Sequence, residues 1–111
     1  IQGLKLKEGI SMDVNVQSVH FKADQKLIDF CEKRVNKLDS FFEGFLGAEV
    51  ILRLEKDEEK ENKMAEIKIS APANEMLFAK KQAKTFEEAV DLTIDALRKQ
   101  IDKFKTRIKP K

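Results

Sequence analysis

Lysine and arginine side chains are the residues in this sequence best suited to chemistry, and that chemistry is the binding of phosphate groups. They gather in three clusters. The first shares one helical face, because its members are seven and four residues apart, and Arg34 lies beside it: Lys26, Lys33 and Lys37. The second is a run without acids in a loop expected before the last helix: Lys80, Lys81 and Lys84. The third occupies the final turns of that helix: Arg98, Lys99, Lys103, Lys105, Arg107 and Lys109.

Each cluster also has a plainer interpretation, which the sequence leaves open. Asp29 and Glu32 lie near the first cluster, so its lysines could form ion pairs on a solvated face. The second cluster could be an ordinary solvated loop. In the third, Lys99, Lys103 and Arg107 form one ridge at positions i, i+4 and i+8, yet cations in the last turns of a helix also stabilise its dipole.

The distribution of charge favours a polyanion as the partner. The 111 residues carry a net charge of only +2. Residues 98–111 hold seven basic groups and one acid, Asp102, for a net charge of +6, so the other 97 residues carry −4. A basic end on an acidic body is typical of a protein that binds nucleic acid in one orientation. A solvated basic tail would give the same composition.

Enzymatic and cofactor chemistry has little support in the sequence. His20 is the only histidine and is expected on the surface, and Cys31, the only cysteine, is expected as a small buried hydrophobic residue. Two such residues cannot build the usual histidine and cysteine metal cages, and no phosphate-loop or dinucleotide-binding motif occurs. We therefore expect no catalytic residue, metal, cofactor or small-molecule substrate.

Composition also limits the location and the mode of binding. No apolar stretch approaches the roughly 20 residues of a membrane-spanning helix, and a single cysteine fits the reducing cytoplasm. The chain has no Trp or Tyr, and Phe78 is the only aromatic residue in an expected strand. Base stacking on a sheet is therefore disfavoured, and we expect recognition of phosphate positions and RNA shape.

The elements that must position these lysines follow from hydrophobic periodicity. Alternating apolar residues predict strands, and the 3.6-residue period predicts helices, of which the last begins at a capping box, Thr85 to Glu88. The glycines near residue 44 end the first helix, and the acidic run 55–61 is expected as a hairpin loop. The predicted strands are 13–19, 49–55, 64–71 and 75–80. The first helix is predicted at 24–40, and the second runs for about 24 residues from the capping box.

The predicted order is β-α-β-β-β-α, an α+β fold. Three strands have one apolar face and each helix has one apolar stripe, so the simplest architecture is a four-stranded sheet with both helices packed on one face. The other face of the sheet would be polar and wet, and the free chain a monomer. Residues 1–11 precede Met12 and are interpreted as an upstream remnant or an artificial leader, which leaves 12–111 as one domain.

Three stretches in this order resemble the ribosome hibernation-promoting factor family, also called ribosome-associated inhibitor or sigma-54 modulation protein. They are MDVNVQS at 12–18, the helix 24–38 that ends in RVNKL, and TFEEAVD at 85–91 with its continuation to residue 105. The resemblance covers residues 12–108 and matches the short form of the family, without the C-terminal extension through which long members pair two ribosomes.

The resemblance implies a fold like the double-stranded-RNA-binding domain. It implies binding to the small subunit and to the whole ribosome, in the channel for mRNA and tRNA, with 16S-type rRNA as the partner. Translation would be inhibited and idle ribosomes would enter hibernation in stationary phase. Carried over to this sequence, the rRNA contacts would come from Lys26, Lys33, Lys37, Lys99, Lys103 and Lys105, with Lys80, Lys81 and Lys84 where the family often has basic residues.

Two residues depart from the family pattern, and two other functions stay open. Asp102 stands where helix ends in the family are often basic, and Phe86 where many members have Tyr. The alternatives are a protein-binding regulator that modulates a sigma factor and a general structured-RNA-binding domain. The first would need an exposed apolar patch, which the sequence does not plainly offer.

Overall fold

The order of helices and strands agrees with the prediction. The computed structural model describes residues 12–42, 44–55 and 61–108. Its elements are β1 (Asp13–Val19), α1 (Gln25–Asn36), the 3₁₀ turn η1 (Lys37–Ser40), β2 (Gly47–Leu54), β3 (Lys63–Ala71), β4 (Glu75–Ala83) and α2 (Phe86–Ile108). Residues 1–11, most of the acidic run 55–61, and Lys109 lie outside the described residues.

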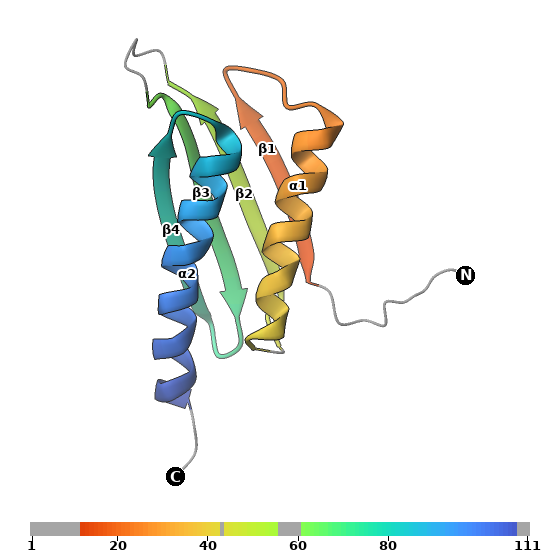
Figure 1. The fold of residues 1–111 in the computed structure, drawn as a ribbon. Helices are drawn as coiled ribbons and strands as arrows, with labels where there is room; N and C mark the ends of the chain where they lie inside the picture. Colours follow the sequence, from red (N-terminus) through yellow and green to blue (C-terminus); the bar gives the residue numbers. More distant parts are fainter. Residues whose placement is uncertain (1–11, 43, 56–60, 109–111) are drawn as a thin grey trace, which may run out of the picture.

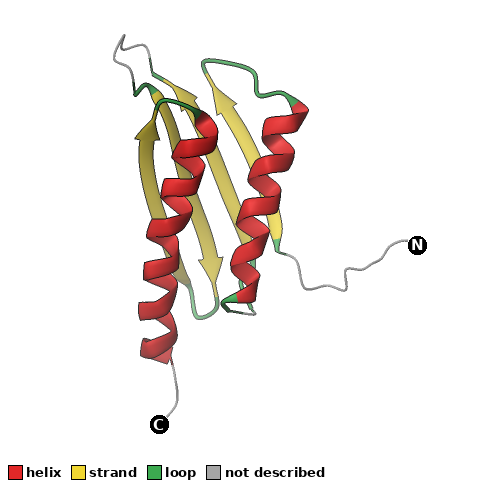
Figure 2. Ribbon diagram, in the orientation of Figure 1, coloured by secondary structure: helices red, strands yellow, loops and turns green. Residues whose placement is uncertain are grey.

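The four strands form one mixed sheet in the order β1-β2-β3-β4. β1 and β2 are parallel, because α1 carries the chain back across one face of the sheet, while β2, β3 and β4 form an antiparallel meander. Figures 1 and 2 show α1 and α2 side by side on the same face, as predicted, with the opposite face uncovered. β1 and β4 are the two edges of the sheet.

The hydrophobic core lies between the sheet and the two helices. Of the residues predicted to face inward from the second and third strands, six are buried: Ala48, Val50, Leu52, Ala65, Ile67 and Ile69. Leu54, predicted in the same set, lies at the end of β2 and is only partly buried. The stripes of the two helices complete the core with Leu27, Cys31, Val35, Val90, Leu97, Ile101 and Phe104. Apolar residues recur every second position in the strands and about every 3.6 positions in the helices, so they lie on one face of the sheet and on one face of each helix. The opposite faces are left to the solvent.

Both helix starts are capped as the sequence predicts. The Asp24 carboxylate accepts the Leu27 backbone N–H at 2.9 Å, and the Thr85 hydroxyl oxygen accepts that of Glu88 at 3.1 Å. The reciprocal bond of the capping box, from the Thr85 N–H to the Glu88 carboxylate, is absent among the described contacts. Stacking of Phe86 on Phe21 holds the first turn of α2 instead, with ring centroids 4.4 Å apart.

Two predicted boundaries were wrong in ways that affect the site. The first helix was predicted to continue to residue 40, but its last four residues form η1, whose Ser40 hydroxyl donates to the Lys37 carbonyl at 2.7 Å. The last strand was predicted to end at residue 80 and extends to Ala83. The sequence AKKQA lacks the apolar alternation of a half-buried strand, because β4 is an edge strand and such strands are often lysine-rich.

Phenylalanines that follow η1 pack with Phe104 of α2 at one end of the core. Phe42 lies 4.9 Å from Phe45 and 5.1 Å from Phe104, measured between ring centroids. Phe45 and Phe104 are buried. These rings therefore pack the end of the core, as predicted, rather than forming an aromatic surface.

Candidate nucleic-acid interface

The C-terminal half of α2 presents three exposed lysines, Lys99, Lys103 and Lys105. Lys99 and Lys103 lie one turn apart on one flank of the helix. Lys105 lies on the other flank, because two residues turn an α-helix by about 200°. The helix thus offers cations on both sides of its exposed face, with Glu87 and Glu88 at its opposite end. The acids at its start and the bases at its end also suit the helix dipole.

Two side chains fix α2 against the edge of β4. The Gln100 amide nitrogen donates to the Phe78 carbonyl at 2.6 Å, and the Gln100 amide oxygen accepts the Phe78 N–H at 3.2 Å. About two turns further along, Arg107 donates to the Glu75 carboxylate at 3.0 Å. Lys103 follows Gln100 by three residues and precedes Arg107 by four, so it lies on the same flank, next to the edge of β4.

The second predicted cluster does not form a loop. Lys80 and Lys81 lie inside β4, and only Lys84 lies in the turn before α2. Adjacent strand residues point to opposite faces: Lys80, opposite Glu66, lies on the open face, and Lys81 on the helix side. The expectation of one loop was wrong because β4 is longer than predicted. All three lysines are nevertheless exposed and surround one edge of the sheet.

The lysines of the first cluster lie on α1 and on η1, which follows it. Lys26 and Lys33 are exposed on α1 and Lys37 is exposed at the start of η1. Arg34, beside them, donates to the Asp91 carboxylate of α2 at 2.9 Å. That side chain joins the two helices, so the cations available to a ligand on this face are the three lysines.

The other two arginines of the predicted site also have protein partners. The Arg98 guanidinium lies 4.3 Å from the centre of the Phe41 ring, and Arg107 is bound to Glu75. None of the nine predicted lysines forms an ion pair with another described residue. The lysines are therefore the groups that are free to contact phosphates.

Acids interrupt the exposed face of α2. Asp95 and Asp102 line a shallow hollow of about 300 Å³ together with Arg98 and Lys99. A phosphate that approached Lys99 along the crest of the helix would therefore meet two carboxylates. Approach from the flanks, toward Lys103 or Lys105, avoids most of this repulsion.

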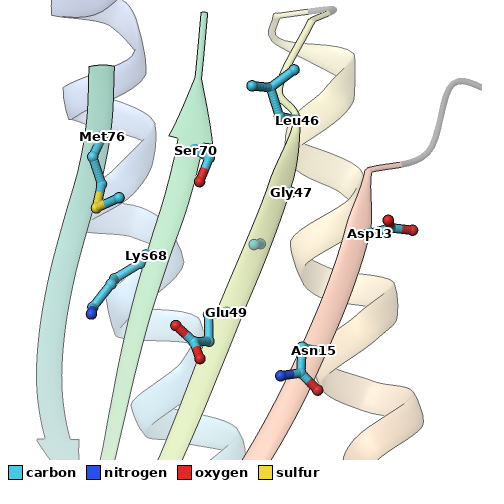
Figure 3. A pocket seen from close by; sticks show the side chains of 9 residues that line it. Asp13, Asn15, Leu46, Gly47, Glu49, Lys68, Ser70 and Met76 are labelled. Atoms are coloured by element: carbon cyan, nitrogen blue, oxygen red, sulfur yellow. The ribbon is translucent and has the colours of Figure 1, made fainter. Parts of the chain in front are cut away.

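The open face of the sheet is less polar than predicted. Leu46, Met76 and Phe78 expose 66%, 57% and 43% of their surface. Figure 3 shows Leu46 and Met76 at the rim of a shallow hollow of about 520 Å³, which also contains Asp13, Asn15, Gly47, Glu49, Lys68 and Ser70. Gly47 has no side chain, so no atoms beyond the backbone fill the hollow at this position. The sequence did not plainly offer exposed apolar residues on this face, and the structure shows these three.

The only cysteine and the only histidine lie apart from the lysine clusters. Cys31 is fully buried, and burial, followed by the nearby carboxylates of Glu87 and Glu32, raises the pKa of its thiol from 9.0 to about 12. His20 is exposed just after β1. Among the described residues, no three histidine, cysteine or carboxylate side chains come together as metal ligands. In the same part of the chain, no helix is long and apolar enough to cross a membrane.

Sequence reasoning missed the contacts that organise the site. The two hydrogen bonds of Gln100 to the backbone of Phe78, called the Gln100 clamp below, could not be predicted. A single glutamine on a polar helix face has no distinctive sequence pattern. The sequence also did not show that the arginines have partners within the fold while the predicted lysines form no ion pair with described residues. The positions of Glu75 and Asp91 relative to arginine depend on strand register and helix packing, which a one-dimensional pattern does not specify.

Comparison with known proteins assigns the chain to a family. The sequence model of the family described as sigma 54 modulation protein / S30EA ribosomal protein matches residues 14–109. The ribosome hibernation promotion factor of Bacillus subtilis (strain 168) is 26% identical over 101 residues, which are 90% of this chain and 52% of that protein. The ribosome hibernation promoting factor of Pseudomonas putida is 26% identical over 96 residues, which are 86% of this chain and 89% of that protein. The chain thus spans about half the length of the first relative.

Solved structures share the fold. The N-terminal domain of Protein Y from Thermus thermophilus superposes with a TM-score of 0.72 at 23% identity, covering 84% of this chain and 99% of that one. A ribosomal subunit interface protein from Coxiella burnetii gives a TM-score of 0.73 at 16% identity, covering 86% and 99%. The β-α-β-β-β-α sheet with two helices on one face is therefore an established fold.

Proposed function

The chain belongs to the sigma 54 modulation protein / S30EA ribosomal protein family, and from this premise we propose that it binds ribosomes and promotes their hibernation. The observation that carries the proposal is the set of nine exposed lysines on α1 and η1, on α2, and along β4 and the turn after it, none of which forms an ion pair with a described residue. Relatives named ribosome hibernation promoting factor support the same function.

The proposal extends to where and when the protein acts. It binds the small subunit in the channel for mRNA and tRNA, blocks translation in stationary phase, and works in the cytoplasm as a monomer of one ribosome-binding domain without catalysis or a cofactor. The rRNA contacts come from Lys26, Lys33, Lys37, Lys80, Lys81, Lys84, Lys99, Lys103 and Lys105. Arg98 and Arg107, predicted in the same set, act by holding α2 in place.

The chemistry of recognition is electrostatic. Lysine ammonium groups spread over two helices and one strand edge match phosphates at several separate positions rather than one bidentate site. Seven to nine phosphate contacts would release counterions and give a log–log dependence of affinity on salt with a slope of roughly −5 to −8. Such binding is sensitive to RNA shape and largely indifferent to sequence.

Sedimentation with ribosomes from the same host tests the function. The purified protein is centrifuged through sucrose gradients with ribosomes at several salt concentrations. We expect it to travel with the small subunit and with whole ribosomes, and to dissociate steeply as salt rises. A protein that stays at the top of the gradient at low salt contradicts the proposal.

A charge-reversal variant tests the assigned surface. Lys99→Glu, Lys103→Glu and Lys105→Glu together should abolish co-sedimentation and leave the circular dichroism spectrum unchanged, since these side chains are exposed. The matched control makes the same change of charge at the opposite end of the sheet: Lys22→Glu, Arg53→Glu and Lys63→Glu. Equal loss in both variants would mean that total charge, rather than this surface, determines binding.

A second function, binding of a protein such as a sigma factor, has one observation in its favour, the exposed Leu46, Met76 and Phe78. Capture of a sigma factor by the pure protein in the absence of RNA would support it. A general RNA-binding domain is the third possibility. Free duplex RNA of arbitrary sequence should then displace the protein from ribosomes as effectively as rRNA does.

A further inference from the structure

Phe78 is the one phenylalanine that lacks an aromatic or guanidinium partner. The chain has eight phenylalanines, all within the described residues. Five contact another ring, namely Phe21, Phe42, Phe45, Phe86 and Phe104, and Phe30 and Phe41 each lie under an arginine. Phe78 makes neither contact and is 43% exposed on the open face of the sheet. Its ring is available to a planar ligand.

Two lysines lie beside this ring on the same face. Lys68 of β3 is directly opposite Phe78 in the strand register, and Lys80 follows Phe78 by two residues along β4. Figure 3 shows the Lys68 side chain leaning across toward β4. Neither lysine forms an ion pair within the described part of the chain, although Glu49 lies opposite Lys68 and Glu66 opposite Lys80.

The backbone under the ring is held rigid. Gln100 bonds both the N–H and the carbonyl of Phe78 at 3.2 and 2.6 Å, which ties this point of β4 to α2. The same helix carries Lys99 and Lys103, and Lys81 and Lys84 lie along the same sheet edge. Phe78 therefore lies on the open face of the sheet, next to the edge that carries these lysines.

We propose that Phe78 stacks on an unpaired RNA base, with Lys68 and Lys80 contacting the phosphates on either side of that nucleotide. The inference rests on the proposed function and adds a base contact to a surface otherwise limited to phosphates. An aromatic ring flanked by ammonium groups is the arrangement by which proteins hold single-stranded RNA. A preorganised ring loses little entropy on binding. RNA is favoured over protein here because the free lysines continue along the edge of β4, whereas carboxylates limit the rest of the open face.

Binding measurements separate a stacking contact from a phosphate contact. Phe78→Ala should weaken ribosome binding by about 5- to 150-fold, the range for loss of one stacked base, without changing the slope against salt. Lys80→Gln should instead reduce the magnitude of the slope by roughly 0.7 to 0.9. Met76→Ala is the control, because Met76 is more exposed on the same strand face but is not aromatic. Phe78→Tyr should bind ribosomes about as tightly as the wild type, because tyrosine keeps an aromatic ring that can stack on a base.

A fluorescence measurement reports the stacking directly. The chain has no tryptophan, so Phe78→Trp introduces a single indole. We expect its emission to be quenched by the small subunit and by protein-free rRNA. The control is Leu46→Trp, an exposed position at the far side of the same face, whose emission should change little.

The outcomes distinguish this inference from the proposed function. If the wild-type protein does not bind ribosomes, the proposed function fails. If the wild type binds and Phe78→Ala binds as tightly as Met76→Ala, the stacking contact is wrong while the function stands. Emission of the Phe78→Trp variant that responds to ribosomal proteins free of RNA, and not to rRNA, would identify the face as a protein-docking surface and overturn the inference.

Discussion

The two kinds of basic side chain have different roles in this protein. Arg34, Arg98 and Arg107 bind a carboxylate or a phenylalanine ring within the fold, whereas the predicted lysines extend into solvent. The guanidinium group suits such fixed contacts, because it is planar, forms directed bonds and stacks on rings. An ammonium group on a flexible stem adapts to phosphates at varied positions. Arg98 and Arg107 were predicted as RNA contacts together with the lysines, and their contacts within the fold are a second role that charge alone does not reveal.

Buried Cys31 gives a testable dependence of stability on pH. Its pKa is raised from 9.0 to about 12 in the folded protein, first by burial and then by Glu87 and Glu32. Above pH 9 the unfolded chain loses the thiol proton while the folded chain retains it. The contribution of Cys31 to the free energy of unfolding is therefore fully present below pH 9. It is lost between about pH 9 and 12, on the order of 1 kcal/mol per pH unit.

Urea unfolding of the wild type and of Cys31→Ala from pH 8 to 11 measures this effect. Every other ionisable group is the same in both proteins, so the difference between their free energies of unfolding isolates the thiol. We expect that difference to shrink as pH rises. Parallel curves for the two proteins would contradict the assignment. The native thiol should also resist alkylation at pH 8 and react after unfolding.

At the scale of elements, the exposed edge of β4 is protected by a side chain. An edge strand presents unpaired N–H and carbonyl groups on which another chain can pair. Gln100 occupies both groups of Phe78, and the Arg107 ion pair with Glu75 holds the end of α2, about two turns further along, against the same strand. Lysines at 80 and 81 further discourage a second strand from approaching. The chain thus remains suited to the proposed monomeric state.

Gln100→Ala should lower the free energy of unfolding by about 1–2 kcal/mol, because two hydrogen bonds are lost and the better helix propensity of alanine offsets little. It should also promote association at high concentration, which sedimentation velocity detects. Gln82→Ala is the matched control, since Gln82 donates a single bond to the Glu61 carbonyl at 3.0 Å. A Gln100→Ala protein as stable and as monomeric as that control would refute the clamp.

The sequence predicted elements well where burial determines the pattern. Most of the predicted inward residues of β2, β3 and the two helices are buried, and Asp24 and Thr85 each accept a backbone N–H of the first helical turn as predicted. Leu54, Ile28 and Ile94 are only partly buried. The turn at 72–75 is also present, with Ala73 and Asn74 at φ of 65° and 61°. Prediction failed at the end of β4, where only one strand neighbour exists and lysines replace apolar residues. That error assigned Lys80 and Lys81 to one loop instead of two faces.

At the scale of the whole molecule, the fold distributes the nine predicted lysines over three segments that are far apart in sequence: α1 with η1, β4 with the turn after it, and α2. α1 and α2 bring two sets to one side of the sheet, and β4 carries the third along its edge (Figure 1). Hydrophobic pattern predicted the shared helix layer, and the family resemblance predicted its use. Neither showed that the third set continues onto the open face beside Phe78, because that placement depends on strand length and register.

Counting phosphate contacts by salt dependence tests whether the two helices form one binding surface. Neutral variants are used so that no repulsion is added: Lys26, Lys33 and Lys37 to Gln in one protein, Lys99, Lys103 and Lys105 to Gln in another, and all six in a third. Each set of three should reduce the magnitude of the log–log slope for ribosome binding by roughly 2 to 3, and the combined variant by about twice that. Additivity is expected because counterion release counts contacts and the two sets do not pair with each other. A set that leaves both slope and affinity unchanged is a solvated face, and the RNA would then contact only the other helix and the edge of β4.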